Sequence, residues 1–159
     1  MDSITLKKLK ESFADLLFDL GNALGDDFAV VRKDKIVDIA RFLRDDPELQ
    51  YNFLIDISAV DYLKRRPRFE VVYHFFSLPL KHRVRVKAPV EEKDPALPTL
   101  VSLWKGADWF EREVWDMFGI RFEGHPDLRR ILMYEGFEGH PLRKDYAINR
   151  RQPLIGPKN

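Results

Sequence analysis

The sequence predicts an α+β fold: a two-layer sandwich in which helices cover one face of a mostly antiparallel sheet, followed by an extended C-terminal arm. Segments with helical and strand periodicity alternate early, three strand-like segments follow in the middle, and helical spacing returns later. With 159 residues, of which 45% are hydrophobic, the chain can bury one core. Beyond Gly119 the pattern becomes irregular and rich in glycine and proline. We therefore expect a core domain over residues 1–119 and a loop-rich docking arm over residues 120–159.

The first elements are two helices with a short strand between them. Ser3 can cap a helix that runs to about residue 20, because apolar residues follow it at helical spacing before two glycines end the pattern. Residues 28–31 are apolar and β-branched enough to form a short strand. A second helix is predicted from Asp34, and the sequence Asp-Asp-Pro at 45–47 closes it.

The middle of the chain predicts three strands. Residues 53–60 and 69–76 are rich in aromatic and β-branched residues, which favours buried strands. Residues 82–87 alternate, with Val84 and Val86 facing inward. The outward side chains of this strand are all basic: Arg83, Arg85 and Lys87. Such alternation is typical of an antiparallel strand with one face in water.

Two helices are expected next, over residues 98–104 and 107–118. The second carries a group of charged residues, namely Glu111, Arg112, Glu113 and Asp116. Three carboxylates invite an acid–base or metal interpretation, but Glu111 and Glu113 are two residues apart and point to nearly opposite sides. Asp108, Arg112 and Asp116 instead form a row of alternating charge at a spacing of four residues, which favours a structural or interfacial role.

A five-residue string, Phe-Glu-Gly-His-Pro, occurs at Phe122–Pro126 and again at Phe137–Pro141. Glycine permits backbone conformations that other residues avoid, and proline keeps the preceding histidine extended, so both copies predict a sharp turn. Each copy leads into leucine and two basic residues: Arg129 and Arg130 after the first, Arg143 and Lys144 after the second. A metal bridging the histidines His125 and His140 is the alternative, but two imidazoles without a third ligand make a poor zinc site.

Composition excludes several classes of function. The chain has no cysteine, which rules out disulfides and thiolate ligands for zinc or an iron–sulfur cluster. Its net charge of +1 is too small for a typical nucleic-acid binder, although the first 50 residues are acidic and the last 39 are basic. We find no run of about 18 apolar residues, no phosphate-binding glycine loop and no nucleophile motif. From the residues alone we therefore predict no catalytic, cofactor-binding or metal-binding residue, and an arm that docks on a partner.

Three runs in the last third of the chain resemble the signature of a known family. The runs Glu111–Ile120 and Gly124–Leu132 resemble the first hallmark of the 30 kDa subunit (designated C) of proton-pumping NADH:quinone oxidoreductase, respiratory complex I. The segment Gly136–Tyr146 looks like its second hallmark.

The resemblance implies a non-catalytic structural subunit of the peripheral arm. The whole complex transfers electrons from NADH through FMN and iron–sulfur clusters to quinone and couples this to proton translocation. FMN, the clusters and quinone are then bound by partner subunits. The resemblance also implies that this chain packs chiefly on the subunit designated D, with the one designated B and the neighbouring iron–sulfur subunits nearby. The resemblance implies a peripheral position on the cytoplasmic side of the cell inner (plasma) membrane, with membrane contact only through the complex and no role for nucleic acid.

The signature positions become candidate assembly contacts under this resemblance. They are Glu111, Arg112, Glu113, Asp116, Gly124, His125, Pro126, Arg129, Arg130, Gly139, His140, Pro141, Arg143, Lys144 and Asp145. Two alternatives stay open. One is the equivalent subunit of a related membrane-bound hydrogenase or of a quinone reductase with another electron donor. The other is a standalone metal-dependent hydrolase that uses Glu113, Asp116 and the turn histidines.

Overall fold

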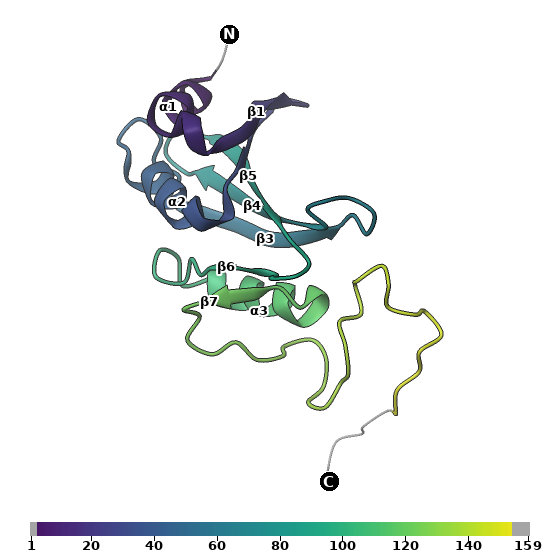
Figure 1. The fold of residues 1–159 in the computed structure, drawn as a ribbon. Helices are drawn as coiled ribbons and strands as arrows, with labels where there is room; N and C mark the ends of the chain where they lie inside the picture. Colours follow the sequence, from purple (N-terminus) through teal and green to yellow (C-terminus); the bar gives the residue numbers. More distant parts are fainter. Residues whose placement is uncertain (1–2, 154–159) are drawn as a thin grey trace.

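A five-stranded sheet organises the first two thirds of the molecule (Figure 1). The computed structural model describes residues 3–153. The sheet has the order β1-β2-β5-β4-β3, and its strands are β1 (Leu17–Ala23), β2 (Asp26–Val31), β3 (Phe53–Asp61), β4 (Phe69–Ser77) and β5 (His82–Val90). Neighbouring strands are antiparallel except β2 and β5, which are parallel. The predicted mostly antiparallel α+β fold is confirmed, with a mixed sheet as the added detail.

Three α-helices pack against the sheet: α1 (Ile4–Phe13), α2 (Ile36–Asp45) and α3 (Ala107–Phe118). The shorter elements are the 3₁₀ turns η1 (Ala14–Leu16) and η2 (Lys33–Lys35) and a separate parallel pair of strands, β6 (Ala96–Pro98) and β7 (Arg121–Glu123). The Ser3 hydroxyl caps α1 by accepting a hydrogen bond from the amide of Leu6 at 3.2 Å, as the sequence predicts.

The hydrophobic core lies between the helices and one face of the sheet. Alternate residues of β4 and β5 point into it, among them Tyr73, Phe75 and Val86, each with no exposed surface. Helix α2 contributes Ile39 and Leu43 to the same core. The inward orientation predicted for Val84 and Val86 is therefore confirmed, and it leaves Arg83, Arg85 and Lys87 on the other face of the sheet.

The predicted first helix is wrong over its second half. Helix α1 ends at Phe13, and residues 17–23 form the edge strand β1 instead. The Leu24–Gly25 pair has positive φ at both residues, which makes a tight two-residue hairpin turn into β2. Apolar residues at 16, 17 and 20 fit either a helix or a strand, and pairing with β2 decides for the strand.

The predicted helix over 98–104 is also wrong. Residues 96–98 form β6, and the chain then makes a turn over residues 101–103. Strand β7, which lies inside the segment predicted to lack regular structure, pairs with β6. Each of these strands has only three residues, too few to give a pattern of alternation.

Residues 124–153, hereafter the arm, contain no helix or strand. The arm runs along α3 and then away from it (Figure 1). Among the residues that the structure describes, no helix is long and apolar enough to span a membrane.

Candidate functional site: helix α3 and the arm docked on it

Helix α3 buries two of its carboxylates, Glu111 and Asp116, so that neither has any exposed surface. Glu113 between them is exposed. The opposite orientation predicted for Glu111 and Glu113 thus holds. The expected surface row of charges does not, because Asp116 points into the protein and only Arg112 and Asp108 remain paired, at 3.9 Å.

Glu111 holds the segment that follows β6. One carboxylate oxygen accepts a hydrogen bond from the Thr99 hydroxyl at 2.5 Å and the other from the Leu100 amide at 2.7 Å. Burial raises the pKa of Glu111 to about 7, against the opposing effect of these two donors. The Tyr73 hydroxyl is buried nearby on β4 and has no hydrogen-bond partner among the described residues.

Asp116 organises the first part of the arm. Its Oδ2 accepts hydrogen bonds from the backbone amides of Ile131, Leu132 and Met133 at 2.9–3.1 Å. Its Oδ1 accepts from Arg130. Burial alone would raise the pKa of Asp116, but the Met133 amide and the Arg130 guanidinium lower it below the ordinary value. A buried carboxylate therefore substitutes for the secondary structure that this segment lacks.

The second Gly-His-Pro turn caps the C-terminal end of α3. The last carbonyls of a helix have no partner within the helix. Here His140 Nδ1 donates to the Asp116 carbonyl at 3.0 Å, the Leu142 amide to Met117 at 3.1 Å, and Arg143 Nε to Phe118. Since a carbonyl can only accept, the Nδ1 atom of His140 carries a proton, and burial lowers the pKa of this imidazole.

Gly119 makes this cap possible. It adopts φ +74°, and a β-carbon there would come within 2.6 Å of the His140 ring and 2.7 Å of the Arg143 guanidinium. Any larger residue would therefore strain the backbone here and displace the His140 and Arg143 side chains that cap α3.

The first Gly-His-Pro turn binds the side of α3 instead. His125 Nε2 lies 3.3 Å from the Asp108 carbonyl, and its Nδ1 accepts from the Asp127 amide at 3.0 Å. Arg112 donates to the carbonyls of Arg129 and Arg130, both at 3.2 Å. The two copies of the repeated string thus fix the arm to α3 at two separate places.

A further joint connects the arm to the sheet. Sequence reasoning named its arm residues, Lys144 and Asp145, as assembly contacts, and missed its sheet residues, Asp61 and Arg68. Arg68 is 2% exposed and makes a two-pronged pair with Asp61 at 2.8 and 2.9 Å. It also pairs with Asp145 of the arm at 2.8 Å and with Glu92. Asp61 in turn accepts from the Lys144 amide at 2.8 Å. The Arg68 guanidinium holds the pKa of Asp61 well below its usual range. Neither partner has a pattern around it that predicts a buried pair.

The side chains named for the hydrolase alternative lie apart or are already bound to other groups. Asp116 is occupied by four donors, and Glu113 faces solvent on another side of α3. Within residues 3–153, no group of three or more histidine or acidic side chains could hold a metal ion. The two turn histidines bind separate carbonyls of α3, which removes the support for the hydrolase alternative.

The outward side of the arm is apolar in places and basic in others. Leu132, Leu142 and Ile148 are 56%, 54% and 105% exposed, respectively. Arg129 is 72% exposed beside Asp127, and Lys144 is also exposed. In contrast, Arg130 and Arg143 turn inward to α3. The basic residues that follow the two turns are therefore divided: some fix the arm to α3 and others face outward.

These features define a class of protein: a structural chain whose buried charges hold its own backbone and whose arm presents an apolar and basic outer surface. The family model described as "Respiratory-chain NADH dehydrogenase, 30 Kd subunit" matches residues 29–152. The NADH-quinone oxidoreductase subunit designated C 2 in Rhizobium etli is 47% identical over 155 residues, which cover 98% of this chain and 82% of the relative.

Two solved structures are similar as well. The trypsin-resistant fragment (1–134) of Nqo5 shares 39% identity at a TM-score of 0.66, over 79% of this chain and 100% of the fragment. A chain of the membrane-bound sulfane sulfur reductase, an archaeal respiratory membrane complex, shares 27% identity at a TM-score of 0.74, over 90% of this chain and 84% of that one. The chain belongs to the family of 30 kDa subunits of respiratory-chain NADH dehydrogenase.

Proposed function

We propose that this chain is a non-catalytic structural subunit of the peripheral arm of an NADH:quinone oxidoreductase. In this proposal it binds no cofactor, and FMN, iron–sulfur clusters and quinone belong to its partners. The chief partner is the subunit designated D, with the one designated B and the neighbouring iron–sulfur subunits beside it. The complex places the chain peripherally at the cytoplasmic side of the inner membrane.

One observation carries the proposal: the arm is fixed in shape without regular structure, and it presents apolar side chains outward. If the arm served only to stabilise this chain, its leucines would be expected to pack against the core. Leu132 and Leu142 instead expose more than half of their surface. Exposed apolar side chains beside arginine are typical of the centre of a protein–protein interface. We therefore assign the contact with other subunits to the outward side of the arm.

Purification through a tag on this chain, at its natural level of expression, tests the proposal. We expect the other subunits to come with it in equal amounts, including one that oxidises NADH through flavin. The isolated chain should contain neither flavin nor iron in stoichiometric amount. Recovery of the wild-type chain alone, or with bound metal, would contradict the proposal.

A matched pair of variants locates the contact. Leu132→Asp combined with Leu142→Asp should lower the yield of assembled complex at least tenfold, because two charges would be buried in an apolar interface. Leu24→Asp is the control: this leucine is 106% exposed in the β1–β2 turn, at the other end of the molecule. Equal losses for both changes would show that the arm is not the contact.

The similarity to the sulfane sulfur reductase favours a second candidate, the equivalent subunit of a respiratory complex with another electron donor. The same purification separates the two, because only the first predicts an NADH-oxidising flavin subunit among the proteins recovered.

A further inference from the structure

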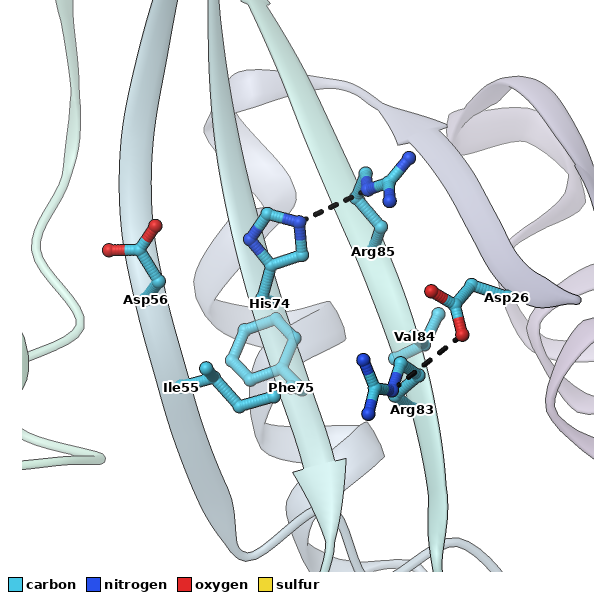
Figure 2. A pocket seen from close by; sticks show the side chains of 8 residues that line it. All are labelled: Asp26, Ile55, Asp56, His74, Phe75, Arg83, Val84 and Arg85. Atoms are coloured by element: carbon cyan, nitrogen blue, oxygen red, sulfur yellow. Dashed lines mark hydrogen bonds and ion pairs between the residues drawn. The ribbon is translucent and has the colours of Figure 1, made fainter. Parts of the chain in front are cut away.

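The open face of the sheet carries a polar row across three strands. Strand register places Asp56 of β3 beside His74 of β4, and His74 beside Arg85 of β5. Figure 2 shows these side chains next to one another on adjacent strands. The helices pack against the other face, so no element described in the structure covers this row.

The row is held in one geometry by a hydrogen bond. Arg85 Nε donates to His74 Nε2 at 3.1 Å. A guanidinium has no acceptor, so His74 is neutral and carries its proton on Nδ1. Burial and the nearby Arg85 charge lower the pKa of His74, which keeps it in this form. The guanidinium of Arg85 is thereby oriented, and its two terminal nitrogens have no acceptor within residues 3–153.

Other charges on this face are already compensated. Lys87 lies 3.6 Å from Glu70, and Arg83 lies 3.6 Å from Asp26. Within the described part of the chain, Arg85 and Asp56 make no ion pair, and they stand at opposite ends of the row. Two strand spacings separate them, or about 10 Å.

The surface around the row is hollowed and partly apolar. A hollow of about 230 Å³ is lined by the exposed Ile55 together with the row; Phe75 and Val84 border it too, but their side chains are buried in the core. An adjoining one, which shares the row, reaches Ser58 and Val60. Ile55 and Val60 are 38% and 37% exposed. Exposed apolar side chains around an oriented arginine are typical of the centre of a protein–protein interface.

We propose that this face binds a segment of another subunit of the same complex, distinct from the contact of the arm. The segment presents a carboxylate to the two terminal nitrogens of Arg85, a basic side chain to Asp56, and apolar side chains to Ile55 and Val60. Charge complementarity determines this pattern, because the row presents the Arg85 guanidinium at one end and the Asp56 carboxylate at the other. That the occupant is a subunit rests on the proposed function.

Because the chain lacks cysteine, a single introduced thiol reports on this face. Ser58→Cys lies in the adjoining hollow and is exposed. We expect its maleimide labelling, read by the mass of this chain, to fall at least tenfold in the assembled complex relative to the isolated chain. Ser12→Cys is the control, since Ser12 is exposed on α1. Equal labelling of Ser58→Cys in both states overturns the inference.

Charge reversal tests the recognition itself. Arg85→Glu should lower the yield of assembled complex about tenfold through repulsion of the carboxylate. Arg41→Glu should not, because Arg41 lies on the exposed side of α2. Arg85→Met, which removes the charge without reversing it, should show a smaller loss. Unchanged assembly of Arg85→Glu would overturn the inference.

These experiments distinguish failure of the proposed function from failure of this inference. A wild-type chain that brings down no other subunit contradicts the proposed function. Assembly that proceeds with Ser58→Cys still reactive contradicts only this inference. A disulfide-linked pair of Ser58→Cys chains from the complex would show that a second copy of this chain occupies the face, which also overturns it.

Discussion

The sheet and the arm are held by different forces. Tyr73, Phe75 and Val86 have no exposed surface, and the sheet they belong to is stabilised chiefly by apolar burial. The arm buries little apolar surface, with Leu128 and Met133 only partly buried against the core. Its shape depends on a few buried ionic groups that donate to or accept from its backbone. Loss of one such group should therefore release a long segment at once.

This difference suits the two regions to different uses. A region with few apolar contacts lies at the low end of local stability, so the arm depends on its buried ionic groups for the shape that it presents to a partner. The sheet and the helix α3 packed on it provide the rigid frame: the arm attaches to Asp61 of β3 and to Asp116 of α3.

Arg68→Met should have the largest effect, because it removes the joint between the two regions. It leaves Asp61, which is 3% exposed, without its cation. We expect a loss of about 4 kcal/mol in the free energy of unfolding, measured by urea denaturation. The double variant Asp61→Asn/Arg68→Met should recover at least half of this loss. A single-variant loss below about 1 kcal/mol would mean that the joint does not connect the regions.

Asp116→Ala should affect the arm alone. Three backbone amides and Arg130 lose their acceptor, and we expect the arm to be destabilised by about 3 kcal/mol. Trypsin cleavage within the arm should accelerate about 100-fold, while the thermal midpoint of the sheet changes little. Asp127→Ala is the control, since this aspartate is exposed beside Arg129. Loss of the sheet together with the arm would break the comparison.

The smallest expected effect on the free energy of unfolding comes from Glu111, and this effect depends on pH. Its folded pKa of about 7 lies above the ordinary 4.5, so between these values the folded state holds a proton that the unfolded state has lost. Stability therefore falls as pH rises through this window, by about 2 kcal/mol from pH 5 to pH 7.

Glu111→Gln should remove this component. The lowered pKa values of His74 and His140 act in the opposite direction, but both proteins share them, so the difference between wild type and variant isolates Glu111. Urea denaturation at several pH values measures it. A difference that is constant with pH would show that Glu111 is ionised throughout.

Much of the fold could be predicted from periodicity. The strands β3, β4 and β5 and the helices α2 and α3 follow from local patterns, and so does the capping role of Ser3. Strand β1 could not be predicted, because its apolar spacing also fits a helix and only pairing with β2 distinguishes them. Strands β6 and β7 are too short to carry a pattern.

The candidate site, too, could be predicted only in part from the sequence. The repeated Gly-His-Pro strings mark the turns, and their resemblance to the 30 kDa subunit family is confirmed. The assembly roles of the signature residues remain predictions. No pattern distinguishes Arg130, which turns inward, from Arg129 beside it, which turns outward.

By itself the sequence determined the fold class, the family, the turns and the absence of cysteine, because these depend on residue identity and local spacing. Only the tertiary structure decided which charges are buried and what they hold. A carboxylate such as Asp116 is equally compatible with solvent and with the interior until distant backbone amides converge on it. Such convergence depends on the path of the whole chain.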